Sequence, residues 1–443
     1  MTSQYHDINK LQNHLINKLQ YQQISMSPHH HITIIGGGII GLSSAWYLNE
    51  AGYQVTVVDQ SDLLDGTSHG NAGMIVPSHF VPLAAPGVIQ QGLKWMLDSK
   101  SPFYIKPRLN VDLMQWVWRF YRSCTPEKVQ KAMPILQAYN EWSKELYQAF
   151  AKEPNFDFCF EKKGLLMLYQ SSKVGEEEIE MAEQAHALGL KAEILSAMEV
   201  QALEKDIPLD VAGGVYYPGD AHLYPNLFIA QLQQVLLKRG VNILSNTSIT
   251  NFKKDKGQVS HLQTQDGRVI PVQKVLVCAG SWSAELLKKL RLKILLQDGK
   301  GYSITLKKPK NKPAYPTILT EAKVAITPMG EDLRIGGTLE LSNLSPKVNR
   351  NRLQGILESV PKYYPGFEMD QADLQEVWHG FRPCTPDGLP YMGALPTYKN
   401  LYLATGHAMM GMSLGPATGK LMAEMIQGKS TQLDLSLFKP DRF

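Results

Sequence analysis

Cysteine is scarce in this chain, and no two cysteines lie close enough in sequence to suggest a shared metal ion. The 443 residues include only Cys124, Cys159, Cys278 and Cys384, and none of them forms a CxxC pair. Zinc sites and disulfide frameworks both need cysteines at short or regular spacings. We therefore expect no metal site, a reducing compartment and a cytoplasmic location.

An excess of charge of one sign is also lacking, and this argues against nucleic acid as a partner. Charged residues make up 19% of the chain, and the formal net charge is +4. No block of lysine and arginine interleaves with aromatic residues, as a nucleic-acid-binding surface requires. The hydrophobic content of 44% instead suits a folded globular protein.

Long hydrophobic runs are missing as well. The uncharged run at 32–48 is shorter than the about 20 apolar residues of a membrane span, and Ser43 and Ser44 interrupt it. Residues 1–30 form a polar extension without the apolar core of a secretory signal. We expect no transmembrane helix, and we interpret the histidines at 29–31 as a polar lead-in to a strand.

The most informative segment that is present runs from residue 32 to residue 59. An apolar strand leads into Gly36-x-Gly38-x-x-Gly41, an amphipathic helix follows, and a second apolar strand delivers Asp59. In a dinucleotide-binding βαβ unit the glycines allow the tight turn, the approach of a pyrophosphate and close helix packing. The helix N-terminus offers N–H groups to the phosphates, and the acid accepts hydrogen bonds from a ribose. We therefore predict a bound dinucleotide.

Two further segments have the small residues that let a backbone lie against a ligand. Residues 65–74 follow the second strand and contain three glycines, and residues 274–283 form an apolar strand that ends in a small-residue turn. The alternative for the first segment is a surface turn. The chain has no second GxGxxG, which a flavin enzyme reduced by NADPH usually carries, so we expect the substrate itself to be the reductant.

The region from residue 84 to residue 151 is helical in pattern and rich in aromatic residues. Its stretch 113–120 is apolar most of the way round a helix. We interpret it as a buried helix of a second domain, because apolar helices are usually part of a core. The alternative is a patch for a membrane surface or a partner, with basic residues around it.

Two C-terminal segments complete the pattern. Residues 380–390 (GFRPCTPDGLP) hold Arg382 in a turn made rigid by proline, which suits bidentate binding of a carboxylate; the alternative is a structural salt bridge. Residues 403–419 (LATGHAMMGMSLGPATG) form a strand, a loop of small residues and the start of a helix.

Together with the segments above, these two C-terminal segments resemble the D-amino-acid oxidase superfamily of FAD-dependent oxidoreductases. The likeness covers essentially residues 30–430 and is nearest to bacterial D-amino-acid dehydrogenases and glycine oxidase-like proteins.

The resemblance implies the fold and its division. It implies an α/β (α+β) fold, with a Rossmann-like FAD-binding domain and a second, mixed-sheet substrate domain, both discontinuous in sequence. We assign residues 31–83, 222–290 and 380–435 to the FAD-binding domain. Residues 84–221 and 291–379 form the substrate domain.

The resemblance also implies the site. Arg382 matches the arginine that holds the substrate carboxylate, and Tyr302 is our candidate for a phenol donor to the same group, with a half-buried sheet tyrosine as the alternative. The residues expected to contact FAD are Gly36, Gly38, Ile39, Ile40, Gly41, Asp59, Gln60, Thr67, Ser68, Asn71, Gly73, Met74, Ala279, Gly280, Trp282, Gly406, His407, Gly411, Ser413 and Leu414. The implied activity is oxidative deamination of D-amino acids, by hydride transfer from Cα to the flavin and hydrolysis of the imine to a 2-oxo acid and ammonia.

Three departures from relatives within the superfamily bear on the cofactor, the acceptor and the substrate. Sarcosine oxidase-like members attach flavin to a cysteine where this chain has Gly380, so we expect noncovalent FAD. Their lysine near the flavin has no counterpart in residues 336–339. Glycine oxidases have an arginine where this chain has Met409 and Met410. The apolar loop of this chain fits a substrate with a side chain better than it fits glycine. We therefore expect a dehydrogenase that passes electrons to a quinone or another carrier. The alternative to a purely cytoplasmic location is peripheral contact with the inner face of the cell membrane.

Other functions remain open at this point. The protein could instead be an oxidase or dehydrogenase of glycine, sarcosine or a secondary amine such as D-hydroxyproline. It could also be the flavin subunit of a larger complex, or a nucleotide-binding protein without activity. The oligomeric state does not follow from the sequence.

Overall fold

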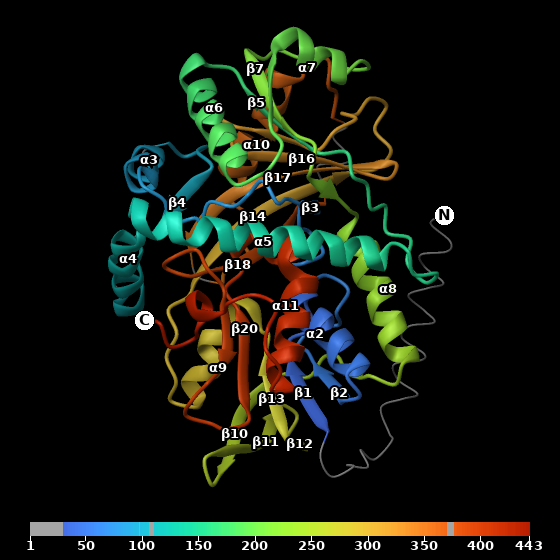
Figure 1. Cartoon of the computed structure of the whole chain (residues 1–443), viewed down its shortest axis with the longest axis vertical. Helices are drawn as coiled ribbons and strands as arrows, with labels where there is room; N and C mark the ends of the chain where they lie inside the picture. Colours follow the sequence, from blue (N-terminus) through green and yellow to red (C-terminus); the bar gives the residue numbers. More distant parts are fainter. Residues whose placement is uncertain (1–29, 97, 106–109, 343, 370–375) are drawn as a thin grey trace.

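The structure is a computed structural model that describes residues 30–96, 98–105, 110–342, 344–369 and 376–443. Except for His30, the predicted polar extension lies outside these ranges. The described chain is built around two large sheets, one in the lower half and one in the upper half of Figure 1. The predicted mixed α/β architecture is confirmed.

The lower sheet has six strands in the order β19–β20–β13–β1–β2–β9. All neighbours are parallel except β19 and β20. The sheet is covered on both faces, and its inner strands are therefore almost continuously apolar. Its strands are β1 (His31–Ile35), β2 (Gln54–Val58), β9 (Asn242–Leu244), β13 (Lys274–Val277), β19 (Tyr391–Ala394) and β20 (Leu401–Thr405).

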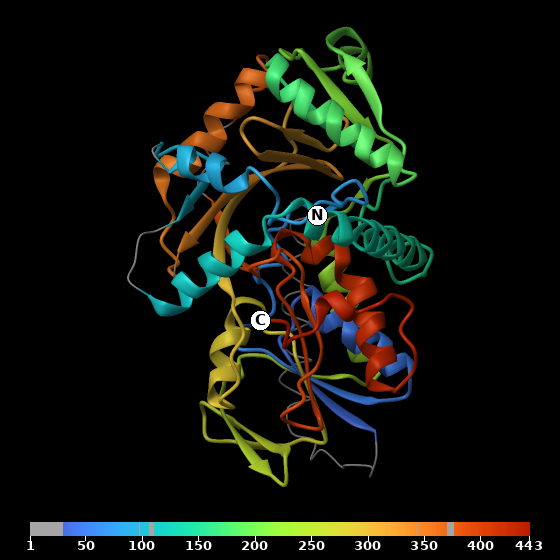
Figure 2. The same cartoon turned by 60° about the vertical axis from the view of Figure 1, so that its left-hand side comes forward.

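Different elements cover the two faces of this sheet. One face packs against α2 (Ile39–Glu50), α5 (Pro126–Phe150), α8 (Pro225–Lys238) and α11 (Gly411–Ile426). The other face packs against α9 (Ser283–Lys289) and a small sheet of β10 (Ile249–Asp255), β11 (Gln258–Thr264) and β12 (Val269–Pro271). Figures 1 and 2 both show this small sheet at the end of the molecule farthest from the upper sheet.

The upper sheet, called the substrate sheet below, runs β18–β14–β17–β16–β15–β5–β7–β6, and β4 pairs with β17. It is largely antiparallel, and its β18 is an edge strand, where proline is tolerated. Its strands are β4 (Phe103–Ile105), β5 (Leu165–Tyr169), β6 (Glu193–Ser196), β7 (Gly213–Tyr217), β14 (Gln297–Leu306), β15 (Thr317–Leu319), β16 (Val324–Met329), β17 (Asp332–Ser342) and β18 (Trp378–Cys384).

Shorter elements complete the described fold. Helices α7 (Ala197–Leu203) and α10 (Arg350–Tyr363) pack on the substrate sheet, as does α6 (Ser172–Ala187) at its β5–β7 end. The pair β3 (Met74–Ile75) and β8 (Ala221–His222) forms a separate two-stranded sheet. The remaining elements are α3 (Val88–Trp95), α4 (Val111–Ser123), η1 (Gly280–Trp282), η3 (Ala408–Met410) and η4 (Ser436–Phe438).

Helix α5 bears on the predicted domain boundaries. It lies in the segment assigned to the substrate domain, yet its buried residues, among them Tyr139 and Tyr147, join the core of the lower sheet. In Figure 1 it crosses the molecule between the two sheets. The boundaries stay a prediction, and the packing of α5 indicates that residues 126–150 belong with the nucleotide-binding half.

The interpretation of residues 113–120 as a fully buried helix is wrong. In α4 only Leu113, Trp116 and Ser123 are buried. Trp118 and Tyr121 are 58% and 61% exposed, and the other exposed apolar residues of this helix are Val111, Met114 and Val117. The stretch is apolar on two faces, and the structure buries one of them.

Candidate active site

One cavity of about 500 Å³ runs along the carboxyl ends of β1, β2, β13 and β20 and reaches β18 and α11. We call it the cofactor cleft. Ligands of open parallel sheets bind at this edge, because loops and helix N-termini meet there. The residues expected to bind the cofactor that line it are Gly36, Gly38, Ile39, Ile40, Asp59, Gln60, Thr67, Ser68, Asn71, Ala279, Gly280, Trp282, His407 and Gly411.

The turn between β1 and α2 needs glycine for geometric reasons. Gly36 has φ +111°, and a Cβ there would lie 2.4 Å from the carbonyl oxygen of Cys278. A Cβ on Gly41 would lie 1.9 Å from the carbonyl oxygen of Gly36. Gly41 therefore lets α2 pack against the strand, as the fingerprint predicts, although it does not line the cleft.

Asp59 ends β2 with its carboxylate held in place. Oδ2 accepts a hydrogen bond from the N–H of Gly37 at 2.6 Å, and Oδ1 accepts from the N–H and Oγ of Ser61 at 2.8 and 2.7 Å. Each carboxylate oxygen can accept more than one hydrogen bond. Asp59 is thus fixed beside the glycine turn and keeps acceptor capacity for a ribose.

The loop at 65–73 forms one wall of the cleft. Ser68 Oγ accepts from the N–H of Ile39 at 3.1 Å, which links this loop to the start of α2. Burial lowers the pKa of His69 to about 4, so its ring is neutral, and Nδ1 accepts from the N–H of Gly66 at 3.0 Å. Asn71 Nδ2 donates to the carbonyl of Met409 at 3.4 Å, which links the loop to η3.

His407 lies in the C-terminal part of the cleft. Its Nε2 lies 3.0 Å from Thr418 Oγ1, which also contacts the carbonyl of Leu414 at 2.8 Å and the hydroxyl of Tyr139 at 2.5 Å. Burial lowers the pKa of His407 to about 3, so the ring is uncharged at neutral pH.

Arg382 lies on β18, between two residues that line the cleft, Phe381 and Pro383. Its own side chain points to the other face of the strand. The guanidinium occupies the space that a Cβ on Gly301 would fill, at 2.3 Å from Nη1, and Nη1 donates to the carbonyl of Thr338. Among the described residues, no carboxylate forms an ion pair with Arg382.

A bulge in β17 presents the carbonyl that holds this guanidinium. The register between β14 and β17 shifts so that Thr338 and Leu339 oppose the single residue Gly301. Thr338 has φ +68°, which is uncommon for a β-branched residue. Bulges are frequent beside functional sites, where they re-aim a group.

The structure does not bring Tyr302 to Arg382. Its role as a carboxylate donor stays a prediction, and its contacts favour the alternative of a sheet tyrosine. Successive residues of a strand face opposite sides, so Tyr302 points away from the face on which Gly301 meets Arg382. Its hydroxyl lies 3.2 Å from Glu340 Oε2 and accepts from the N–H of Asn349 at 3.1 Å. The ring is 1% exposed in the core beneath α10.

Several predicted cofactor residues shape the cleft without lining it. Ser413 accepts from the N–H of Val76 at 3.1 Å and donates to Asn140 at 2.8 Å, so its hydroxyl serves the core. The others outside the cavity lining are Gly41, Gly73, Met74, Gly406 and Leu414. Their contacts with FAD stay predictions.

Some lining residues carried no recognised signal. Three of them lie at the start of β10, where the sequence has no glycine motif: Thr247, Ser248 and Ile249. His379 and Phe381 also line the cleft, and the period-two alternation around Gly380 and Arg382 could have indicated them. The other lining residues outside the predicted set are Gly37, Ser61, Leu63, Asp65, Gly66, His69, Cys278, Ser281, Glu285, Leu286, Lys289, Gly380, Pro383, Ala404, Thr405, Ala408 and Met412, with Ile35 and Val58 at the strand ends.

The glycine turn, the fixed acid and the long cleft at the edge of a parallel sheet are the arrangement of a dinucleotide-dependent oxidoreductase. Residues 31–425 match the model of the DAO family, described as FAD dependent oxidoreductase. The chain belongs to this family, and its cofactor is FAD. The glycine cradle, the acid and the length of the cleft fit that dinucleotide.

Curated relatives and solved structures agree with this assignment. The chain is 31% identical over 410 residues to a D-amino acid dehydrogenase of Helicobacter pylori, covering 92% of this chain and 98% of the relative. It is 32% identical over 420 residues to a D-amino acid dehydrogenase of Neisseria meningitidis serogroup C, with the same coverage. The crystal structure of glycine oxidase from Geobacillus kaustophilus superposes with a TM-score of 0.74 at 22% identity, covering 94% and 99% of the two chains, and this shows the shared fold.

The described residues contain neither a membrane-spanning helix nor a cluster of metal ligands. No helix in these ranges is long and apolar enough to cross a membrane. No group of three or more histidine, cysteine or acidic side chains in them is arranged to hold a metal ion.

Proposed function

We propose that this protein is a FAD-dependent dehydrogenase that oxidises D-amino acids to 2-oxo acids and ammonia. The observation that carries the proposal is Arg382, whose guanidinium lacks a carboxylate partner among the described residues, on a strand that lines the cofactor cleft. A free guanidinium in a rigid setting is suited to an amino-acid carboxylate. The relatives named D-amino acid dehydrogenase support the choice of substrate class.

FAD is held, in this proposal, by the residues that line the cleft, without a covalent bond. Asp59 receives the adenosine ribose, the N-terminus of α2 receives the pyrophosphate, and the loop at 65–71 with His407 borders the flavin. When bound, FAD supplies the two-electron oxidation of the substrate carbon–nitrogen bond. Cys384 is fully buried and its pKa is raised to about 12, so it is unsuited to attachment.

The chain itself orients the amino acid. Nη1 of Arg382 is tied to Thr338, which leaves the rest of the guanidinium fork for a bidentate contact with the carboxylate. Gly301 gives the guanidinium its place. Met74 and Val76 form an apolar cluster with Met410 packed against it, which excludes water from this end of the loop. We assign no general base.

Anaerobic mixing tests the substrate class. We expect D-amino acids to bleach the flavin absorbance of the holoenzyme, and L-amino acids, glycine, sarcosine and D-hydroxyproline to bleach it weakly or not at all. Preferential bleaching by glycine or a secondary amine would replace the proposal with the alternative activity. Absence of bleaching by every amine, in a yellow protein, would favour a subunit that needs a partner.

The carboxylate role of Arg382 has its own test. Because the lost contacts are charge-assisted, we expect Arg382→Ala to weaken substrate binding roughly ten- to a hundred-fold. Arg382→Lys should restore part of the affinity, since it keeps the charge without the fork. The measurement is the substrate concentration for half-maximal bleaching. Unchanged affinity in Arg382→Ala, with FAD retained, would contradict the assignment.

We also propose that the electrons leave to a quinone or another carrier. Residues 336–339, beside Arg382, include no lysine to promote reaction with oxygen. The exposed apolar face of α4, with Trp118 and Tyr121, supports peripheral contact with a membrane where a quinone is available. Fast reoxidation by a quinone analogue and slow reoxidation in air, without stoichiometric peroxide, is the expected result. Rapid peroxide formation would identify an oxidase.

A further inference from the structure

The substrate sheet holds three successive carbonyls of the loop that borders the cofactor cleft. Nη1 of Arg334, on β17, donates to the carbonyls of His69 and Asn71 at 2.7 and 2.8 Å. Oγ of Ser303, on β14, donates to the carbonyl of Gly70 at 2.9 Å. The loop is thus fastened to a sheet that lies more than two hundred residues away in sequence.

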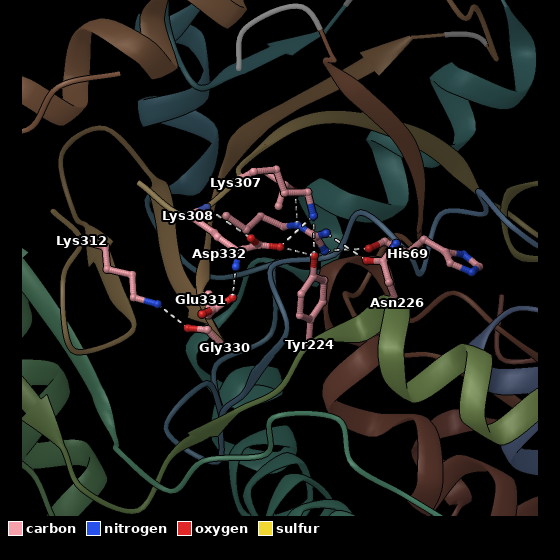
Figure 3. A network of polar contacts seen from close by, with 11 residues as sticks. His69, Tyr224, Asn226, Lys307, Lys308, Lys312, Gly330, Glu331 and Asp332 are labelled. Carbon is pink, nitrogen blue, oxygen red and sulfur yellow. Dashed lines mark hydrogen bonds and ion pairs between the residues drawn. The ribbon is translucent and has the colours of Figure 1, made fainter. Parts of the chain in front are cut away.

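All three nitrogen atoms of the Arg334 guanidinium donate hydrogen bonds. Nη2 donates to Asn226 Oδ1 at 3.0 Å on α8, and Nε donates to Thr305 Oγ1 at 3.0 Å. The guanidinium lies 5.7 Å from the ring centre of Tyr224, and the residue is 4% exposed. Tyr224 in turn donates to Asp332 at 2.8 Å (Figure 3). A planar fork with several donors is needed to reach so many acceptors.

The direct hydrogen-bond partners of this cation are neutral. Backbone carbonyls, an amide and a hydroxyl accept its protons, while the nearby Asp332 is paired with Lys307 at 2.7 Å. Burial lowers the pKa of Arg334 to about 10, so the side chain is still protonated at neutral pH. A positive charge therefore stands behind the loop whose His69 and Asn71 line the cleft.

We propose that Arg334, assisted by Ser303, is a positioning residue that holds the loop at 69–71 against the flavin and couples FAD binding to the docking of the substrate sheet. The residue acts through the loop and does not touch the substrate. Its charge also favours additional negative charge in the cleft, as develops when the cofactor is reduced. This role is independent of which amine is the substrate.

The test separates geometry from charge in the holoenzyme. Arg334→Lys keeps the charge but loses the Nε and Nη2 donors that anchor the side chain to Thr305 and Asn226, whereas Arg334→Gln loses the charge as well. We expect both variants to release FAD on dilution with a dissociation constant about ten-fold or more above the parent value, as the rise in flavin fluorescence reports. The flavin midpoint potential should fall in Arg334→Gln and stay near the parent value in Arg334→Lys.

A matched control is Arg352→Gln, because Arg352 is a second buried arginine of the same sheet region. It is 3% exposed, donates to the carbonyl of Ser101 at 2.5 Å and lies 4.6 Å from the ring of Tyr104. We expect it to lower the thermal unfolding temperature without changing FAD release or potential. If Arg334→Gln does not fold, Ser303→Ala removes one of the three bonds and should still raise the FAD dissociation constant. Parent-like FAD release and potential in the Arg334 variants, or equal effects in the Arg352 control, would overturn the proposal.

Discussion

At the scale of single residues, the site depends on side chains that are absent as much as on those present. Gly301 has no side chain exactly where the guanidinium of Arg382 lies, and Gly36 has none where β13 comes close. Gly301 belongs to no recognised motif and does not line the cleft, so only this spacing identifies it. The value of both glycines is the space that they leave to a neighbour.

We predict that Gly301→Ala impairs substrate binding while leaving FAD in place. The new Cβ would lie 2.3 and 2.4 Å from Nη1 and Nη2 of Arg382, so the guanidinium must move. The expected result is a rise in KM with a smaller change in kcat, measured by steady-state reduction of a quinone analogue. Gly337→Ala is the control, because its Cβ would be no closer than 3.3 Å to any neighbour. A parent-like KM in Gly301→Ala would contradict the position assigned to Arg382.

The residue scale is also where prediction from sequence succeeded and failed most clearly. The sequence was sufficient for Gly36, Gly41 and Asp59, because a local strand–turn–helix pattern determines all three. The side to which Tyr302 points could not be predicted, since only the register and the bulge of β17 reveal which face of β14 meets Arg382. Arg334 could not have been found, because its partners are backbone carbonyls and side chains from three distant segments.

At the scale of elements, helix α4 is the part whose environment the sequence left undecided. Apolar residues on two faces satisfy the pattern of a buried helix, and the structure covers only the face with Leu113 and Trp116. On the uncovered face the rings of Trp118 and Tyr121 stack at 6.1 Å, and Arg122 lies 6.0 Å from the ring of Trp118. Tryptophan, tyrosine and arginine together are typical of a membrane–water interface.

We predict that the protein floats with vesicles that contain anionic lipid and less with neutral ones. The Trp118→Ser/Tyr121→Ser variant should float several-fold less, because the apolar anchor is lost. Met198→Ser is the control, since Met198 is 83% exposed on α7, a different helix. The measurement is the fraction recovered with vesicles in a density gradient. Equal flotation of the double variant and the control would show that α4 is not the contact.

At the scale of the whole molecule, burial of neutral histidines links stability to pH. Burial lowers the pKa of His69, His79 and His222 to about 4 and that of His407 to about 3, against 6.5 for an exposed histidine. Burial raises the pKa of Asp220 to about 7, so the folded protein keeps one proton that the unfolded chain releases above 3.8. The four histidines outnumber Asp220. Between pH 4 and 6.5 the unfolded chain therefore binds more protons than the folded protein does.

We predict that the free energy of unfolding falls as the pH is lowered from 6.5 to 4. Each extra proton on the unfolded chain contributes about 1.4 kcal/mol per pH unit. Both ring nitrogens of His222 are buried without a hydrogen-bond partner in the described structure. His222→Leu should thus weaken the pH dependence, as measured by urea unfolding of the holoenzyme at pH 7 and pH 5. A pH dependence identical to that of the parent would rule out His222 as a contributor.

The six-stranded sheet has one more consequence, which concerns how the protein is made. Its neighbours β1, β13 and β20 come from the beginning, the middle and the end of the chain, and the cofactor cleft is closed by Gly411. A ribosome must therefore synthesise more than nine-tenths of the chain before the pocket exists. A product that ends before Gly411 therefore lacks part of the cleft lining and one strand-flanking helix, α11, so we expect it not to retain FAD.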